Sequence, residues 1–599
     1  MSDPPSTVFK LPESLPSPAD LAEAWSKVVA NAVHLATSAA ARPLDAHVPQ
    51  PFDAAAPARA FGEFAAHLWS HPQELVKAQQ KAASDWMKLW QSAAARAAGR
   101  AADPVAVPER GDRRFNDPAW SDEPVFDYLK QAYLLTAKRA LEMVEEAEGL
   151  DESARTRVEF FTQQYLNAIS PANFAFTNPE AIRKAIDTGS ISLLSGLANL
   201  LADAAQGGLV QRRAEREFEL GVDIAATPGS VVYRNALMEL IQYAPATDQV
   251  YRRPILYVPP LVNKYYLLDL QPKSSLMRWL VEQGHTVFVI SWVNPGPELA
   301  DKAIADYIRQ GPLEALDAIE AATGEREVDL FGFCMGGTLA AIALAWLAAK
   351  GEGGRVASAT TIGTMFDFSR LGQWATFSEP EQLRAMERHL LHKGFMAAQD
   401  LQALFSAVRA NDLIWSSVVN HYLLDREAPP SDILHWFADG AHIPRAFLLE
   451  WAKDILKDNK LAKGGLELDG VRIELGAVKT PLLAISLKDD HVSAWQATYD
   501  SARLFGGDVA FLLGGSGHNA GVINPPSANK HGYWVNAAMP ETAEQWLEGA
   551  ERREGSWWPW WQARLSEDGK AEKVKARAPG DGKLKALEPA PGSYVRNRA

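Results

Sequence analysis

The chain contains one cysteine, Cys334, and its surroundings are typical of a catalytic nucleophile. It lies in Gly332-Phe333-Cys334-Met335-Gly336-Gly337, after an apolar run with strand character and before an apolar run with helix character. This G-x-C-x-G pattern is typical of a nucleophile elbow, a tight strand-to-helix turn whose glycines avoid collisions with neighbouring backbone. A lone cysteine is more often an inert core residue. The strand, the glycines and the helix around it favour a nucleophilic thiol.

The thiol needs a base, because at an ordinary pKa of about 8.5 only a few per cent of it is ionised at neutral pH. Two downstream strand-like runs are each followed by a polar loop. The first loop begins with Asp489-Asp490-His491, and the second contains His518. The order nucleophile, acid, histidine is that of α/β-hydrolases. We therefore predict that His518 takes the thiol proton and that Asp490 orients His518.

The sequence leaves alternatives to these assignments open. Either Asp489 or Asp490 could face the site, and both could be turn or helix-capping residues. His491 could be the base, although it follows the acid directly and lies in the wrong loop for that role. The pair His389 and His392 has no third ligand nearby, so we expect no metal site. The glycines of the His518 loop lack the Lys-Ser/Thr ending of a phosphate-binding loop, so they more simply allow that loop to bend.

Two backbone N–H groups are candidates for an oxyanion hole. Met335 follows the nucleophile and begins the next helix, so its N–H points to where a negative oxygen would form. The second donor is expected in the loop after the first core strand, from Leu261 to Asn263, with Val262 at its centre. A rigid proline turn with an aromatic staple is the alternative explanation of this loop.

Short β-rich runs alternate with helical runs from Pro254 onward, which indicates a parallel sheet covered by helices. We therefore predict an α/β-hydrolase fold. About 120 residues, mostly helical in pattern, separate the fourth and fifth runs, which is too long for a crossover and predicts an inserted cap over residues 365–475. The expected strands are Ile255–Val258, Thr286–Trp292, Val328–Phe333, Ala357–Ile362, Leu482–Leu487 and Val509–Leu513.

Four regions follow from these patterns. Residues 1–105 are Ala- and Pro-rich and are expected to be loosely ordered and helical, and residues 106–245 are expected to form a helical N-terminal domain. Residues 246–565 are expected to form the catalytic domain. Residues 566–599 form a basic tail, interpreted either as solvated chain or as a strap docked on the body or on a partner. The tryptophans at 557, 558, 560 and 561 are expected to pack against the body.

Composition excludes several classes of protein. Hydrophobic residues make up 47% and charged residues 22% of the chain, as in ordinary folded proteins, so disorder throughout is excluded. The net charge of -14 disfavours binding to nucleic acid. A single cysteine forbids an intrachain disulfide, and no leader is evident near Met1, so we expect a cytoplasmic location. The longest apolar run is too short for a transmembrane helix.

The motifs together resemble those of polyhydroxyalkanoate synthases, and the length of the chain resembles class I of that family. The resemblance implies that Cys334 is acylated by a (R)-3-hydroxyacyl-CoA and that His518 activates Cys334. It also implies that Asp490 assists either His518 or the 3-hydroxyl of the substrate. It also implies a homodimer on cytoplasmic polyester granules, with granule-associated proteins as further partners and with no cofactor beyond the CoA that the substrate carries. The motifs are Arg113-Arg114-Phe115, Phe176-Thr177-Asn178-Pro179, Ala226-Thr227-Pro228-Gly229, Asn263 to Leu270, the Cys334 box, Asp490-His491 and Gly517 to Pro526.

The cap departs from the family pattern W-N-x-D-x-T-x-x-P. Trp436 and Asp439 are kept, whereas Phe437 and Ala441 replace the usual Asn and Thr. Trp436, Phe437 and Asp439 are our candidates for lining the cap and the substrate channel.

The same three catalytic groups also suit a cysteine-type hydrolase of thioesters or polyesters, because both reactions pass through an acyl-enzyme. A granule-coating protein that keeps the fold without activity is a further alternative.

Overall fold

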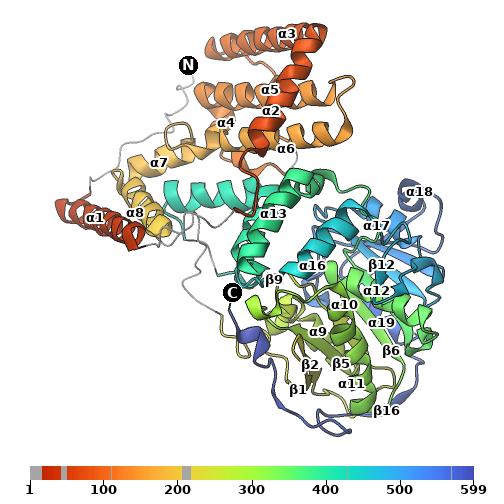
Figure 1. Cartoon of the computed structure of the whole chain (residues 1–599). Helices are drawn as coiled ribbons and strands as arrows, with labels where there is room; N and C mark the ends of the chain where they lie inside the picture. Colours follow the sequence, from red (N-terminus) through yellow and green to blue (C-terminus); the bar gives the residue numbers. More distant parts are fainter. Residues whose placement is uncertain are drawn as a thin grey trace. The chain divides into compact units, whose positions relative to one another are not determined.

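The computed structural model describes residues 16–41, 50–109, 111–205, 218–427, 430–567 and 569–598. They divide into two compact units (Figure 1). The helical unit takes the described residues of Met1–Glu215, Gly372–Phe377 and Ala403–Pro429, and the sheet unit takes those of Arg216–Leu371, Ser378–Gln402 and Pro430–Ala599. The parts of the expected N-terminal regions at 1–15, 42–49, 110 and 206–217 lie outside the described residues.

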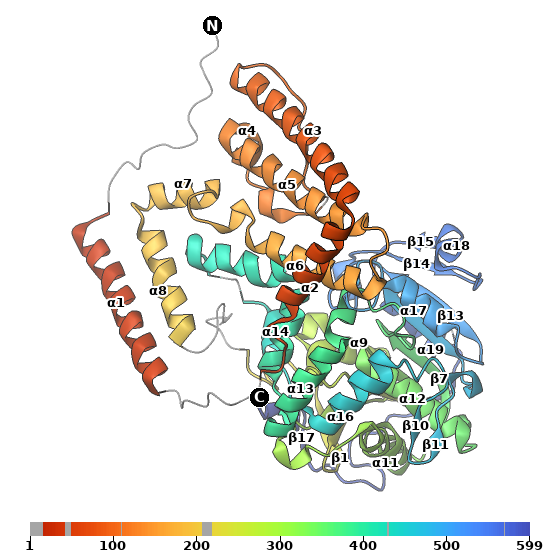
Figure 2. The ribbon, with the colours of Figure 1, turned by 45° about the horizontal axis from the view of Figure 1, so that its top comes forward.

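The helical unit forms where the sequence has helical periodicity. Proline occupies the first turn of the helices that start at Pro72 and Pro124, and the side chains of Asp151 and Asn178 accept N–H groups at the starts of two others. Figure 2 shows the first and last of these helices, α1 and α8, lying side by side. The helices are α1 (Pro18–Ala41), α2 (Ala56–Ser70), α3 (Pro72–Ala97), α4 (Ala119–Asp122), α5 (Pro124–Glu145), α6 (Glu152–Ala168), α7 (Pro179–Asp187) and α8 (Ile191–Ala205).

Part of the expected cap belongs to the helical unit. The π-helical segments η9 (Asn411–Trp415) and η10 (Val418–Leu423) pack there. The Tyr422 hydroxyl donates to Asp203 at 2.7 Å, and Gly196 approaches the Tyr422 backbone so closely that a Cβ would collide with it. The segment expected as one cap is therefore shared between two units.

The sheet unit is built on an eleven-stranded sheet of described residues, in the order β15-β14-β13-β12-β7-β6-β4-β5-β2-β1-β17. The six expected strands are confirmed, and the pairs from β5 to β13 are parallel. The strands are β1 (Gly229–Arg234), β2 (Met238–Tyr243), β4 (Ile255–Val258), β5 (Val287–Trp292), β6 (Val328–Phe333), β7 (Val356–Ile362), β12 (Leu482–Leu487), β13 (Val509–Gly514), β14 (Tyr533–Asn536), β15 (Glu551–Arg553) and β17 (Glu588–Pro589).

Each face of the sheet has its own hydrophobic core. In β4, Leu256 and Val258 enter one core, while Ile255 and Tyr257 enter the other, as the two-residue period of a strand requires. The helices of the first core include α11 (Glu314–Thr323), α12 (Met335–Ala349), α16 (Arg445–Glu450) and α17 (Trp495–Ala502); those of the second include α9 (Leu276–Glu282), α15 (Asp432–Ala438) and α19 (Trp558–Leu565). Two further helices of the cap insertion are α13 (Pro380–Lys393) and α14 (Ala398–Val408).

The prediction of a helical region continuing to residue 245 is wrong at its end. Strands β1 and β2 extend the sheet by antiparallel pairing before that boundary. The reason is a polar pair inside β2: Glu239 and Gln242 are buried in a strand whose other residues are apolar, which hides the strand pattern. Glu239 is stabilised there by Arg234 at 2.6 Å.

The basic tail is a strap on the sheet unit. β16 (Lys573–Lys575) pairs with β3 (Gln249–Tyr251), and β17 pairs with β1. The strap interpretation of the tail is therefore confirmed at these two pairings, while residues 580–587 between them are mostly exposed to solvent. The tryptophan cluster also packs inward as expected: Trp557, Trp558 and Trp561 are buried, and their indole N–H groups donate to Gly521 O, Val522 O and Thr360 Oγ1.

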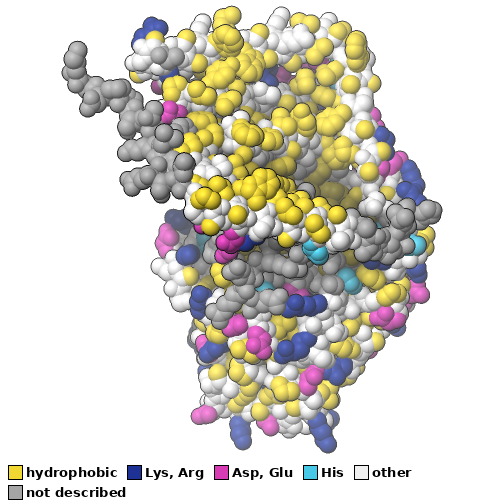
Figure 3. All heavy atoms as spheres, turned by 90° about the vertical axis from the view of Figure 1, so that its left-hand side faces the viewer, with side chains coloured by type: hydrophobic (Ala, Val, Ile, Leu, Met, Phe, Trp, Pro, Cys, Tyr) yellow, Lys and Arg dark blue, Asp and Glu magenta, His cyan; other side chains and the backbone are white. Residues whose placement is uncertain are grey.

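The helical unit exposes several large apolar side chains, among them Trp25, Trp69, Trp90 and Phe176. Figure 3 shows one face of the molecule, with apolar side chains gathered in the upper part of the view. Among the described helices, none is by itself both long enough and apolar enough to cross a bilayer. The bent pair α7 and α8 passes that test only when the two helices are taken together, with an angle of 111° between them.

A buried histidine outside the site gives the sheet unit a predictable acid sensitivity. His285 is 1% exposed, packs 4.7 Å from the Tyr251 ring, and has no hydrogen-bond partner at either ring nitrogen among the described residues. Burial, with a smaller contribution from the Lys573 charge, lowers its pKa to about 3. Between its unfolded pKa of about 6.5 and pH 3, the unfolded chain therefore binds a proton that the folded chain does not.

We expect neutral His285 to contribute its full stabilisation above about pH 6.5. As the pH falls below that value, the free energy of unfolding should decrease by about 1.4 kcal/mol per pH unit because of this residue. His285→Phe keeps a ring against Tyr251 and removes the titration. The free energy of unfolding in urea should therefore fall by about 2 kcal/mol less in this variant than in the parent between pH 6.5 and about pH 5. The exposed His392→Phe is the matched control; equal acid losses in the parent and in His285→Phe would contradict the assignment.

Candidate active site

Cys334 lies at the turn between β6 and α12 in a backbone conformation that few residues adopt. Its φ is 53° and its ψ is -129°, outside the regions favoured by side-chain-bearing residues. The turn is held by the Cys334 N–H, which donates to Ile362 O at 2.9 Å, and by the Thr364 hydroxyl, which donates to Cys334 O at 3.1 Å. Only glycine fits at Gly336, because a Cβ there would collide with the Val258 carbonyl oxygen. The predicted tight strand-to-helix turn is therefore present, and the role of Cys334 as nucleophile stays a prediction.

His518 and Asp490 form a buried pair beside this turn. Nδ1 of His518 lies 2.6 Å from Oδ2 of Asp490, and the two residues are 7% and 8% exposed. The other carboxylate oxygen of Asp490 accepts the N–H groups of Val492 at 2.7 Å and Ser493 at 2.9 Å. The Phe333 ring packs on the imidazole at 4.8 Å between ring centroids. These contacts fix the imidazole with Nδ1 on Asp490.

The charge balance favours a protonated imidazole. Burial alone lowers the pKa of His518, but the negative charges of Asp490 and Cys334, and the hydrogen bonds to both, outweigh burial and raise that pKa to about 10. His518 therefore senses the charges of both Asp490 and Cys334. An imidazole whose pKa is raised in this way can hold a proton taken from a neighbouring thiol, which then attacks as the thiolate.

The geometry separates the open alternatives in the acid loop. Asp490 is buried and bonded to His518, whereas Asp489 and His491 are exposed. The structure therefore brings Cys334, Asp490 and His518 together and leaves Asp489 and His491 on the surface of the loop.

Gly363 is a residue of this site that the sequence analysis missed. It follows β7 with a φ of 54°, and a Cβ on it would lie 3.1 Å from His518 Cε1, 3.2 Å from Nδ1 and 3.3 Å from Asp490 Oδ2. The one available signal was a glycine directly after a strand of the sheet. Its role depends on the order of the strands in the sheet, which the sequence analysis did not predict.

We expect Gly363→Ala to lower kcat by about tenfold to 100-fold, because the added methyl group displaces the His518–Asp490 pair and strains a left-handed backbone. The turnover rate at saturating substrate measures the effect. Gly354→Ala, where a Cβ meets nothing within 4 Å, is the matched control. A kcat for Gly363→Ala equal to that of the control would show that the pair tolerates displacement.

The two expected oxyanion donors lie at the start of α12 and in the loop after β4. Met335 begins α12, so its N–H has no intrahelical acceptor. Val262 lies in the loop after β4, where its carbonyl accepts the Ala441 N–H at 3.2 Å, and Asn263 forms a β-bridge with Gly440. The roles of Met335 and Val262 toward an oxyanion stay predictions.

The expected cap residues contact that same loop. Trp436 is buried and donates its indole N–H to Lys264 O at 2.7 Å. Asp439 accepts the Tyr266 hydroxyl at 2.8 Å and pairs with Lys264 Nζ at 2.7 Å. Phe437 is half-buried against the second core. The kept residues of the cap pattern thus bond the cap to the Val262 loop, which the sequence alone did not indicate.

One group of described residues could hold a metal ion, and it lies in the helical unit. His67, His71 and Glu74 place three ligand atoms within 4.8 Å of one another. The two imidazoles are stacked, with centroids 4.3 Å apart and planes at 23°, so their nitrogens do not converge on one point. This group is separate from the Cys334 site, and we assign no ion to it.

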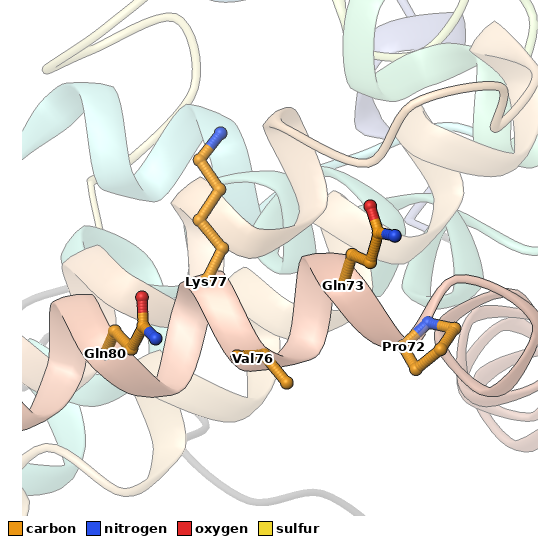
Figure 4. Close-up of a pocket in the computed structure, with 5 residues that line it drawn as sticks. All are labelled: Pro72, Gln73, Val76, Lys77 and Gln80. Carbon is orange, nitrogen blue, oxygen red and sulfur yellow. The ribbon is translucent and has the colours of Figure 1, made fainter.

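A hollow of about 290 Å³ lies along α3 (Figure 4). It is lined by Pro72, Gln73, Val76, Lys77 and Gln80, so it contains neither a nucleophile nor an acid. The Cys334 site remains the candidate active site.

Comparison with known proteins identifies related families over most of the chain. The family described as the poly-beta-hydroxybutyrate polymerase (PhaC) N-terminus matches residues 111–280, and the alpha/beta hydrolase fold matches residues 263–525. The chain is 42% identical over 539 residues to the poly(3-hydroxyalkanoate) polymerase of Methylorubrum extorquens, covering 89% of each chain. It is 40% identical to the polymerase subunit PhaC of Rhizobium meliloti, over 88% of this chain and 87% of that one. It is 39% identical to the polymerase subunit PhaC of Cupriavidus necator, over 88% of this chain and 89% of that one.

Proposed function

Because the chain belongs to the poly(3-hydroxyalkanoate) polymerase family, we propose that it polymerises (R)-3-hydroxyacyl-CoA into polyester with release of CoA. We infer (R)-3-hydroxybutyryl-CoA and other short-chain units as substrates. The observation that carries the proposal is the buried His518–Asp490 pair beside the strained turn at Cys334. A thiol on such a turn, beside an imidazole that is hydrogen-bonded to a carboxylate, suits acyl transfer.

In the first step, Cys334 loses its proton to Nε2 of His518, and the thiolate attacks the thioester carbonyl of the substrate. The N–H of Met335, with Val262 as second donor, stabilises the tetrahedral oxyanion. Collapse of that intermediate breaks the bond to CoA, and His518 returns its proton to the departing thiolate. One thioester replaces another at nearly equal free energy, so the acyl group stays activated on Cys334.

In the second step, the 3-hydroxyl of one acyl unit attacks the thioester of another. His518 accepts the hydroxyl proton as the ester bond forms, and the proton passes to the sulfur that leaves. A serine ester would not keep this driving force, which explains why a cysteine suits polymerisation. Water must be kept from the acyl-enzyme, and the apolar cap residues Trp436 and Phe437 are suited to excluding it.

The reaction needs no cofactor beyond the CoA carried by the substrate. We further propose that the protein works as a homodimer in the cytoplasm, on the surface of the polyester granules that it extends, where granule-associated proteins are further partners. The change to Phe437 and Ala441 in the cap removes an amide and a hydroxyl, and we expect it to alter acyl-chain preference while leaving the three catalytic groups unaffected.

Incubation with (R)-3-hydroxybutyryl-CoA tests the function. CoA release with insoluble polymer supports the polymerase. CoA release with free 3-hydroxybutyrate would identify a hydrolase, and absence of release would identify a coat protein. Comparison with (R)-3-hydroxyoctanoyl-CoA tests the proposed preference for short units.

A further inference from the structure

Lys264 is a buried lysine that the catalytic steps do not use. It is 7% exposed, and lysine is rarely buried unless it is paired. Its Nζ lies 2.7 Å from Asp439 Oδ1 and donates to Val595 O at 2.7 Å. Burial lowers the pKa of Lys264, and the Asp439 charge opposes that effect. The ammonium is therefore bound at once to the cap and to the C-terminal strap.

The bonds around Lys264 fix the Val262 loop to the cap. The Lys264 carbonyl accepts the Trp436 indole N–H, and Tyr266, two residues further on, donates to Asp439. At Val262 and Asn263 themselves, the bond from Ala441 N to Val262 O and the Asn263–Gly440 bridge bind the loop to the chain that follows Asp439.

The strap end that Lys264 contacts is itself held firmly. Val595 is 1% exposed in the second core, and the N–H groups of Ser593 and Tyr594 each donate to Glu239 Oε2 at 3.1 Å. The Tyr594 hydroxyl donates to Asn235 O at 2.7 Å. Lys264 therefore joins three segments that are distant in sequence, and each has its own anchor.

We propose that Lys264 is a positioning residue for acyl transfer: by bonding Asp439 of the cap and the Val595 carbonyl of the strap, it holds the Val262 loop where a loop N–H faces the thioester on Cys334. A donor stabilises an oxyanion only when it is already in place, and a displacement of about 1 Å costs about 100-fold in rate. The inference rests on the proposed function, which supplies the oxyanion. It makes the C-terminal strap part of the active-site support.

The test uses the full chain with Lys264→Met, which keeps the length of the side chain without its charge, and Asp439→Asn, which keeps the shape of the acid without its charge. Both should lower kcat for CoA release from (R)-3-hydroxybutyryl-CoA by about tenfold to 100-fold while KM stays within about twofold. Lys273→Met removes an exposed lysine close in sequence and should match the parent.

The double variant Lys264→Met/Asp439→Asn, which keeps an acceptor for the Tyr266 hydroxyl, separates positioning from stability. Each single variant leaves a buried group without its partner and should lower the melting temperature, whereas the double variant leaves no unpaired charge. We expect its melting temperature to recover while kcat stays low. Recovery of kcat together with the melting temperature, or single variants with the kcat of the parent, would overturn the inference. If the parent and Lys273→Met release no CoA, the proposed function fails, and the inference fails with it.

Discussion

Replacing Cys334 by alanine should abolish CoA release from (R)-3-hydroxybutyryl-CoA, with a loss of about 10⁴-fold or more, while the protein stays folded. The variant removes the sulfur but keeps a Cβ at the same strained φ of 53°, so it adds no new backbone strain. Two hydrogen bonds also hold the turn: the N–H of residue 334 donates to Ile362 O, and the Thr364 hydroxyl donates to the carbonyl of residue 334. Alanine keeps both, because they involve only the backbone of residue 334. The loss should therefore be one of chemistry and not of structure.

The measurement is direct, because Cys334 is the only cysteine of the chain and the variant has no thiol of its own. A thiol reagent then reports released CoA alone. Mass spectrometry after brief incubation should show one acyl group on the parent and none on the variant. Cys334→Ser tests the nucleophile further: we expect it to lose at least about 10³-fold, since a hydroxyl is far less ionised than a thiol. Appreciable CoA release by Cys334→Ala would mean that another group is the nucleophile.

The sequence predicted those parts of the site that depend on local pattern. The glycines around Cys334 report a tight turn, and the loops that carry Asp490 and His518 follow apolar runs that could hardly be anything but strands of one sheet. Strand order then brings the three side chains to the same edge. The sequence analysis chose Asp490 but left Asp489 open, because adjacent residues in a loop differ only in direction; the structure places Asp490 against His518.

The parts that the sequence did not predict depend on pairing between distant segments. Lys264 lies within the Asn263 to Leu270 motif, but its partner Val595 is 331 residues away in the sequence. Val595 contributes a backbone carbonyl, which any residue type could supply, so the sequence does not indicate the contact. Gly363 matters only because β12 and β13 bring Asp490 and His518 against it. Strand β2 was missed because its buried Glu239 is neutralised by Arg234 and bonded by the strap. In each case the role of the residue comes from tertiary contacts and not from its type or its neighbours in the sequence.

The second large effect is expected for Asp490→Asn, at about 10²- to 10³-fold in kcat at neutral pH. An amide keeps the size of the side chain and still accepts the N–H groups of Val492 and Ser493 at its oxygen. Its NH₂ group then faces Nδ1 of His518, which must become an acceptor, so the ring carries its proton on Nε2 toward Cys334 and cannot accept the thiol proton. The loss should be smaller than for a serine nucleophile, since a thiol is partly ionised without help.

The pH profile tests this explanation. In the parent, the charges of Asp490 and Cys334 overcome burial and raise the pKa of His518 to about 10. Without the Asp490 charge, burial prevails and that pKa falls, so the imidazole stays neutral in its unproductive form. A thiolate needs no base, and rising pH ionises thiols without one, so the deficit of Asp490→Asn relative to the parent should shrink between pH 7 and pH 9. Asp489→Asn, one residue away and exposed, is the matched control and should follow the parent throughout. A deficit in the control equal to that of Asp490→Asn, or one in Asp490→Asn that does not change with pH, would contradict the assignment of Asp490 as the residue that orients His518.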